Sequence, residues 1–331
     1  MRERSNHDVE RTPLRKIVIL IPNAEPMRER LLDAFPQIDV AIGNPKVPAD
    51  IADADMVIAW WLSEDGLAAA KRLRWLHVGA AGVEQILEVP GFRERSLILT
   101  NSSGISAPNM AEHAIALMLG FARKFPSLYR SQAERHWQDW DAGHNTFEIG
   151  GQTVVLVGLG AIGQAIAVRA RALGMHVVGV RRTADGATPD GVDEVVALAD
   201  LDSALGRADH VINSLPDTLQ TSRMFDAQRF AAMKPGAYIY NLGRGTTIDH
   251  EAMIAALESG HLAGAGLDVT DPEPLNEDSV LWGMPNVFIT AHTSGNSPMV
   301  RERLIDLCVE QVRRYVAGEA LLNVVDQAEG Y

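Results

Sequence analysis

The chain has 331 residues, about twice the size of a typical domain, so we expect two domains with substantial cores. Hydrophobic residues make up 47% of it and charged residues 22%, a composition typical of soluble globular proteins that excludes a disordered chain. Thirty Lys and Arg against 43 Asp and Glu leave a formal net charge of -13, which disfavours nucleic acid or anionic lipid as a partner.

Cysteine content and hydropathy further limit the classes of protein to which the chain can belong. Cys308 is the single cysteine, so the chain can form neither an internal disulfide nor a cysteine metal site, and we predict no metal. No segment reaches the roughly 18 uninterrupted apolar residues of a membrane helix. Residues 1–16 are charged and lack the apolar stretch of a secretory signal, so we expect a loose tail and a cytoplasmic protein.

Short Val- and Ile-rich runs alternate with helical stretches in the first third of the chain. This alternation is typical of an α/β fold whose parallel sheet is covered on both faces. The predicted strands lie within 16–23, 37–43, 54–61, 74–82 and 97–106, and the predicted helices are 25–35 and 64–73. Pro108 suits the first turn of the long buried helix predicted for 109–125.

Residues 126–147 are polar and aperiodic, which favours an extended arm. Trp137 and Trp140 on this arm would then form a partner surface, or they would fold back on their own domain from a surface helix.

A second strand and helix series opens at Gly151. Its predicted strands lie within 151–157, 176–180, 193–198, 208–216, 237–245, 262–269 and 286–292. A final helix after Asn296 has an apolar face of Val300, Leu304, Leu307, Cys308, Val312 and Tyr315. If this helix returns to the first domain, the domains are 1–107 plus 297–331 and 108–296, each a doubly wound parallel sheet.

The glycine motif Gly158-Leu159-Gly160-Ala161-Ile162-Gly163 joins the strand 153–157 directly to a helix. In this context the glycines permit a tight turn, close backbone approach to a pyrophosphate and close helix packing. The helix N-terminus adds partial positive charge for the phosphates. The motif therefore predicts a dinucleotide site.

The next strand ends in Arg181-Arg182-Thr183, where NAD sites carry an Asp or Glu for the adenosine ribose. Two guanidiniums would bind a 2′-phosphate, so NADP(H) is favoured and NAD(H) stays possible. Alternatively, one arginine stacks on adenine and the protein uses both coenzymes, or Arg182 is a solvated surface charge.

Three chemically capable residues follow neighbouring strands of the second series: Arg244, Glu273 and His292. Open α/β sheets bind ligands at the carboxyl ends of their strands, so together the three indicate a catalytic site. Taken singly, Glu273 could be a loop carboxylate and Arg244 a helix-end charge.

Five ordered motifs resemble the D-isomer-specific 2-hydroxyacid dehydrogenase family over nearly the whole chain. They are Gly158 to Gly163, Ser214-Leu215-Pro216-Asp217-Thr218 with Thr221, Asn241 to Gly245, Gly266-Leu267-Asp268-Val269 leading to Pro272-Glu273-Pro274, and Thr290-Ala291-His292. The resemblance implies a nucleotide-binding domain, here 108–296, inserted into a flavodoxin-like substrate domain. It also implies a homodimer whose arm is 126–147, and a small 2-keto or 2-hydroxy acid as substrate.

The resemblance implies a role for each matching residue. Arg244 would bind the substrate carboxylate and polarise the 2-keto oxygen, and His292 would exchange the proton. Glu273 would fix the His292 tautomer and favour the imidazolium. The loop Gly79-Ala80-Ala81-Gly82 would offer backbone amides to the substrate carboxylate. Further coenzyme contacts are implied for Leu215, Pro216, Thr221, Leu242, Gly243, Asp268, His292 and Ser294, although Asp268 could also be a turn former.

Two departures leave the substrate open: Ala291 stands where the family often has proline, and Val83-Glu84-Gln85-Ile86 follows the substrate loop where Asp and Asn are common. The paired arginines and the Gly79–Gly82 loop resemble the glyoxylate and hydroxypyruvate reductase branch more than the NAD-linked phosphoglycerate branch. The alternatives are a dinucleotide-sensing regulator or corepressor of the same fold, and a dehydrogenase of an unusual donor such as phosphite. Formate is disfavoured because formate enzymes of this superfamily carry Gln at the Glu273 position.

Overall fold

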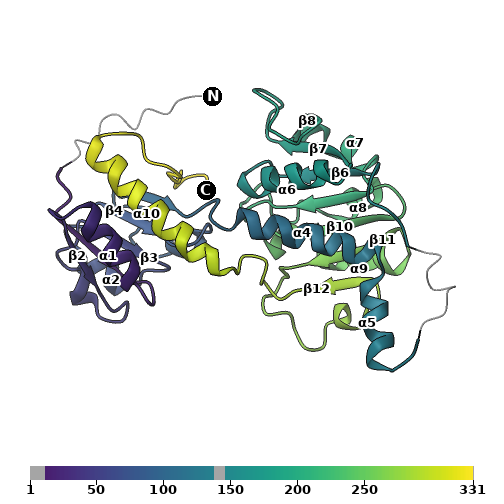
Figure 1. Ribbon diagram of the computed structural model, residues 1–331, viewed down its shortest axis with the longest axis horizontal. Coiled ribbons are helices and arrows are strands. Elements are labelled where there is room, and N and C mark those ends of the chain that lie inside the picture. The colour runs from purple at the N-terminus through teal and green to yellow at the C-terminus, as the bar shows by residue number, and fades with distance from the viewer. Residues whose placement is uncertain (1–11, 138–145, 331) are drawn as a thin grey trace. The chain divides into compact units, whose positions relative to one another are not determined.

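The computed structural model describes residues 12–137 and 146–330. The chain divides into two compact units (Figure 1). The first unit consists of Met1–Ile105 and Ser297–Tyr331, and the second unit of Ser106–Asn296. In the described ranges, no helix combines the length and the hydropathy that crossing a membrane requires.

The first unit contains a five-stranded parallel sheet. Its strands are β1 (Lys16–Ile19), β2 (Asp39–Ile42), β3 (Met56–Ala59), β4 (Trp75–Val78) and β5 (Ile98–Asn101). Their spatial order is β2-β1-β3-β4-β5, which is the flavodoxin-like order, and every pairing is parallel. The predicted α/β architecture is therefore confirmed for this unit.

Helices cover both faces of that sheet. One face packs against α1 (Glu25–Ala34) and α10 (Pro298–Ala317), which lie beside each other (Figure 1). The other face packs against α2 (Glu64–Ala69) and α3 (Glu84–Leu87). Cys308 of α10 is fully buried, and burial raises the pKa of its thiol, so it is a core residue as predicted.

The buried face of α10 differs from the predicted one at four positions. Ile305 and Gln311 are buried, whereas Val300 and Leu307 are only half-buried. Gln311 is polar and so lay outside the predicted apolar pattern, but its amide is satisfied by both backbone groups of Leu322: Nε2 donates to the carbonyl at 2.7 Å, and Oε1 accepts from the N–H at 3.0 Å. A polar side chain is tolerated in a core when it is paired in this way.

The second unit contains a seven-stranded parallel sheet in the order β12-β11-β10-β9-β6-β7-β8. The strands are β6 (Thr153–Val157), β7 (His176–Arg181), β8 (Glu194–Ala197), β9 (His210–Asn213), β10 (Ala237–Asn241), β11 (Leu262–Leu267) and β12 (Val287–Ile289). The order reverses at β6, since β7 pairs with one side of it and β9 with the other. Such a switch point is where doubly wound sheets bind nucleotides.

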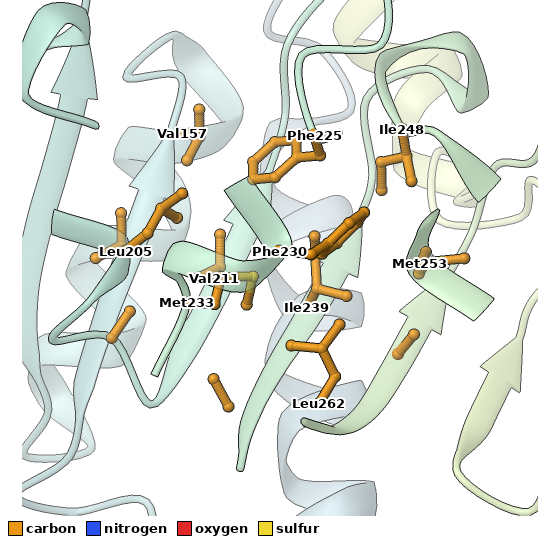
Figure 2. Packing of buried hydrophobic residues seen from close by; sticks show 14 of the residues in the cluster. Val157, Leu205, Val211, Phe225, Phe230, Met233, Ile239, Ile248, Met253 and Leu262 are labelled. Carbon is orange, nitrogen blue, oxygen red and sulfur yellow. The ribbon is translucent and has the colours of Figure 1, made fainter. Parts of the chain in front are cut away.

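Two helical layers enclose the second sheet. On one face, α4 (Ala107–Ala122) packs against α6 (Ala161–Ala172), and the two helices lie side by side in Figure 1. On the other face lie α7 (Leu201–Leu205), α8 (Ala227–Ala232) and α9 (His250–Glu258). Figure 2 shows that layer, in which Val211 and Ile239 of the sheet and Phe230 of α8 belong to one buried cluster.

The predicted extended arm at 126–147 is wrong in its first part. The structure has the helix α5 (Phe125–Ala133) there, and its exposed Phe125 and Tyr129 rings stack edge to face at 6.4 Å. Pro126 lies in the first turn of the helix, where proline is favoured. The sequence analysis did not use this signal because the segment has no apolar period. Trp137 is 90% exposed and does not fold back on its own unit, while Trp140 lies outside the described residues.

Two histidines are buried as neutral rings, one in each sheet. His77 on β4 bonds the Thr100 hydroxyl at 2.8 Å through Nδ1 and the Ser102 hydroxyl at 3.1 Å through Nε2. His210 on β9 bonds the Tyr240 hydroxyl at 3.0 Å and the Gln152 amide oxygen at 2.7 Å. Burial lowers the pKa of both rings to about 4.

The buried histidines predict acid-sensitive stability. In the unfolded chain they titrate near the ordinary 6.5, so between pH 6.5 and about 4 the unfolded state binds more protons than the folded one. The free energy of unfolding should therefore fall as pH falls through this window, by about 3 kcal/mol for each histidine. Urea unfolding at pH 7.5 and pH 5 measures it. His210→Gln should flatten the slope, the exposed His176→Asn should not, and a wild-type slope of zero would contradict the prediction.

Candidate functional site

The residues with predicted roles in the second unit follow its strands at one edge of the sheet. Arg244 follows β10, Glu273 follows β11 and His292 follows β12, and these three strands are neighbours. The glycine motif follows β6. Because all strands are parallel, their carboxyl ends lie along one edge of the sheet. Along that edge Arg244, Glu273 and His292 follow the three strands at one end of the strand order, and the glycine motif follows β6 further along it.

The glycine turn has the shape that a pyrophosphate requires. Gly158 has φ +106°, a conformation that side chains disfavour, and a Cβ on Gly163 would lie 2.0 Å from the Gly158 carbonyl oxygen. A Cβ on Gly160, in contrast, would meet no atom within 4 Å, so the backbone is open to solvent where α6 begins. With the free amides of the helix N-terminus, this turn fits a dinucleotide phosphate group.

The loop after β9 lies against this turn. The Ser214 hydroxyl donates to the Gly158 carbonyl at 3.2 Å, and a Cβ on Gly243 would lie 2.4 Å from the Leu215 carbonyl oxygen. Within the loop the Thr221 hydroxyl donates to the Pro216 carbonyl at 2.6 Å. The structure therefore brings together the glycine turn and the predicted coenzyme residues after β9 and β10.

The two arginines after β7 have different surroundings. Arg181 donates from Nε to the Thr183 carbonyl at 3.0 Å and from Nη2 to the carbonyls of Ala184 and Gly186 at 3.3 Å. These bonds from the Arg181 guanidinium thus hold the backbone of the 183–186 loop. Arg182 and Thr183 are exposed at the rim of that loop.

The backbone of Arg244 is held by buried side chains that the sequence analysis did not single out. Its carbonyl accepts from Asn241 Nδ2 at 2.9 Å and from Thr247 Oγ1 at 2.5 Å. Asn213 Nδ2 donates to both the Asn241 amide oxygen and the Thr247 hydroxyl, at 3.0 and 2.6 Å. A Cβ on Gly245 would lie 1.9 Å from the Thr270 carbonyl oxygen, so the turn also packs directly on the segment after β11.

His292 and Glu273 are in direct contact. Nδ1 of the imidazole bonds Oε1 of the carboxylate, which leaves Nε2 as the nitrogen that can exchange a proton with a ligand. The side chains are 52% and 39% exposed, so both reach solvent. A histidine oriented by a carboxylate is the arrangement used for general acid and base catalysis.

The strand predicted within 286–292 is shorter in the structure, and His292 lies beyond its end. β12 ends at Ile289, and Ala291 and His292 form a left-handed turn with φ +48° and +55°. Proline holds φ near about -65°, so it could not occupy position 291 in this turn. Ala291, which stands where the family that the chain resembles often has proline, is compatible with this turn.

Asp268, predicted as a coenzyme contact, is 2% exposed and bonds the turn that carries His292. Its Oδ1 accepts from the Thr290 hydroxyl at 2.8 Å and from the Thr293 amide at 2.9 Å. Its Oδ2 accepts from the Ser294 hydroxyl at 2.5 Å. The His292 amide donates to the Asp268 carbonyl at 2.6 Å. Asp268 and Ser294 therefore hold the backbone on both sides of His292.

The loop Gly79-Ala80-Ala81-Gly82 follows β4 in the first unit. The Ser102 amide donates to the Ala80 carbonyl at 2.9 Å, and Asn101 Nδ2 donates to the Ala81 carbonyl at 2.7 Å. These bonds fix the peptide planes of the loop from the end of β5.

Over the described parts of the chain, no group of three or more His, Cys, Asp or Glu side chains could hold a metal ion.

Comparison with known proteins identifies a family and several relatives of this chain. The family described as D-isomer specific 2-hydroxyacid dehydrogenase, NAD binding domain, matches residues 115–294. The chain is 32% identical to D-3-phosphoglycerate dehydrogenase of Mycobacterium bovis over 92% of its own length and 54% of that protein's. It thus spans about half the length of the first such relative.

Two further relatives match almost end to end. Glyoxylate/hydroxypyruvate reductase A of Serratia proteamaculans is 30% identical, with 93% of this chain and 97% of that protein covered. The crystal structure of an NADPH-dependent glyoxylate/hydroxypyruvate reductase from Sinorhizobium meliloti with NADP and sulfate has a TM-score of 0.81 at 29% identity, covering 96% of this chain and 100% of that one. On the family match and these relatives, the chain belongs to the D-isomer specific 2-hydroxyacid dehydrogenase family.

Proposed function

We propose that the protein is an NADP(H)-dependent reductase of small 2-keto acids that forms D-2-hydroxy acids. The observation that carries the proposal is the contact between His292 and Glu273, on the sheet edge where Arg244 follows the adjoining strand. A regulator that only senses dinucleotide would need no such proton-transfer pair, which disfavours that alternative.

Each residue has a defined task in the proposed reaction. The Arg244 guanidinium binds the substrate carboxylate and polarises the 2-keto oxygen, because a planar permanent cation suits both oxygens. The nicotinamide, when bound, supplies the hydride to C2. His292 donates a proton from Nε2 to the keto oxygen, and Glu273 stabilises the imidazolium through Nδ1. In the reverse direction His292 accepts that proton.

We propose that the substrate carboxylate also binds backbone amides of Gly79–Gly82. The fixed carbonyls of Ala80 and Ala81 support this, since they orient the peptide planes of the loop. The corresponding domain limits are 1–107 plus 297–331 for the substrate domain and 108–296 for the coenzyme domain. The remaining coenzyme contacts are those predicted for the glycine turn, Leu215, Pro216, Thr221, Leu242, Gly243, Asp268, His292 and Ser294.

Coenzyme preference is proposed to depend on Arg181 and Arg182. Arg181 ends β7, Arg182 and Thr183 follow it directly and are exposed there, and guanidinium groups suit a 2′-phosphate. Arg182→Gln should raise the KM for NADPH about 10- to 100-fold, the value of a charge-assisted bond, and leave the KM for NADH nearly unchanged. Initial rates with both coenzymes measure this. Equal losses for NADPH and NADH would contradict 2′-phosphate recognition.

The function is tested by following reduced-nicotinamide absorbance with NADPH or NADH and a panel of keto acids. The panel contains glyoxylate, hydroxypyruvate, pyruvate and one bulkier aromatic keto acid. NADPH consumption with a small member supports the proposal, and the ranking defines the substrate. Coenzyme binding without turnover on the whole panel would overturn it and favour the regulator or a dehydrogenase of an unusual donor such as phosphite.

We further propose a cytoplasmic homodimer whose contact includes residues 126–147. Supporting this are the exposed Phe125, Leu128 and Tyr129 of α5 and the 90% exposed Trp137, an apolar group that water disfavours. Sedimentation as a monomer at micromolar concentration would contradict it.

A further inference from the structure

His113, on α4, bonds the segment that carries His292. Its Nε2 lies 2.9 Å from the Thr290 hydroxyl and 3.8 Å from Asp268 Oδ1. Thr290 donates its own proton to Asp268 Oδ1 at 2.8 Å, so its oxygen is the acceptor for His113 Nε2–H. The chain of bonds thus runs from α4 through a hydroxyl to the buried carboxylate that holds the His292 turn.

α4 holds this segment at two further points. Asn109 Nδ2 donates to the Ser294 carbonyl at 2.7 Å, and the Ser106 hydroxyl donates to the Gly295 carbonyl at 3.3 Å. Residues 106, 109 and 113 are spaced so that they share one face of the helix. One face of α4 therefore bonds the 290–295 segment on both sides of His292.

The turn needs such support because its backbone is strained. Ala291 and His292 are consecutive non-glycine residues at positive φ, a conformation that side chains disfavour. Conformations of this kind persist only where the surrounding structure holds them. The bonds from Asp268 to Thr290, Thr293 and Ser294 do so, and His113 fixes the Thr290 rotamer that one of those bonds requires.

We propose that His113 and Thr290 are positioning residues for His292: their bond keeps the left-handed turn in place and so holds the imidazole against Glu273. The proposal rests on the proposed function in one respect, that His292 is the proton donor. Neither residue is assigned contact with substrate or coenzyme. Without the bond, the turn should relax and His292 should be presented in several orientations, and a misplacement of about 1 Å can cost about 100-fold in rate.

Matched variants separate the hydrogen bonds from packing. Thr290→Val removes the hydroxyl at equal size and Thr290→Ser keeps it. His113→Leu removes the donor, whereas His113→Gln places an amide N–H at a comparable reach. We expect Thr290→Val to lower kcat about 10- to 100-fold, and His113→Leu less, with the KM for NADPH changed less than about threefold. Thr290→Ser and His113→Gln should keep most of the activity.

A second readout needs neither coenzyme nor turnover. In the wild-type protein the carbon-bound Hε1 of His292, next to the Nδ1 that contacts Glu273, should give a resolved imidazole proton resonance in the NMR spectrum, which His292→Asn removes and thereby assigns. Thr290→Val and His113→Leu should broaden or shift it, and their conservative partners should not. A retained resonance with kcat within twofold of wild type in both loss variants would overturn the proposal, as would equal losses in Thr290→Val and Thr290→Ser.

The two proposals fail in different ways. If His292→Asn leaves turnover intact while the resonance still responds to Thr290→Val, the proton-donor role is wrong and the positioning role stands. If His292→Asn abolishes turnover and Thr290→Val changes neither kcat nor the resonance, the positioning role is wrong.

Discussion

Replacing His292 with asparagine is expected to lower kcat for keto-acid reduction about 10²- to 10⁴-fold, the usual contribution of a positioned acid or base. Asparagine can occupy the turn, since its side chain tolerates positive φ, so the loss should reflect proton transfer and not local unfolding. Single-turnover rates with NADPH would measure it, because they separate hydride transfer from product release. Coenzyme affinity should fall far less than kcat, since His292 is one of many predicted coenzyme contacts and the glycine turn is untouched.

The matched control is His176→Asn, at the opposite edge of the same sheet where β7 begins. It should leave kcat unchanged. Glu273→Gln should cost less than His292→Asn, because the amide oxygen can still accept from Nδ1–H but no longer stabilises a positive ring. Unchanged turnover in His292→Asn would remove this residue from the mechanism.

Replacing Arg244 with alanine is expected to lower kcat/KM for the keto acid about 10²- to 10⁴-fold, through both KM and kcat. The ground state loses a paired carboxylate, and the transition state loses charge stabilisation on the keto oxygen. Steady-state kinetics with varied keto acid at saturating NADPH would show both changes. The fold should tolerate the change, because Asn241 and Thr247 bind the main-chain carbonyl of Arg244 whatever its side chain.

Arg244→Lys is the informative companion variant. It retains the charge but not the planar fork, so it should recover only part of the loss. Arg301→Ala, an exposed position on α10, is the control that should change nothing. A variant of Arg244 that weakened only coenzyme binding would show that the residue serves the dinucleotide and not the substrate.

The architecture was predictable because its signals are local. Short continuous Val- and Ile-rich runs separated by helical stretches identify buried parallel strands, and the structure confirms the two sheets. The glycine motif between strand and helix is likewise a short-range pattern, and Gly158 and Gly163 have the backbone geometry it requires. The helix α5 was predicted only as an alternative to an extended arm, because its apolar side chains Phe125, Leu128 and Tyr129 are exposed and leave no buried apolar period to detect.

The sequence by itself determined the order of the elements along the chain, the glycine turn and the placement of Arg244, Glu273 and His292 after three successive strands, since the positions of strands and turns along the chain depend on nearby residues. Only the tertiary structure decided the bonds that support them. Thr290 is 177 residues from His113 along the chain, and Asn213 is 34 from Thr247. Hydrogen bonds between such distant side chains follow no sequence period, because they depend on which faces of separate elements come together. The bonds of Arg181 were also decided only by the structure, because the carbonyls of Thr183, Ala184 and Gly186 converge on its guanidinium through the fold of their loop.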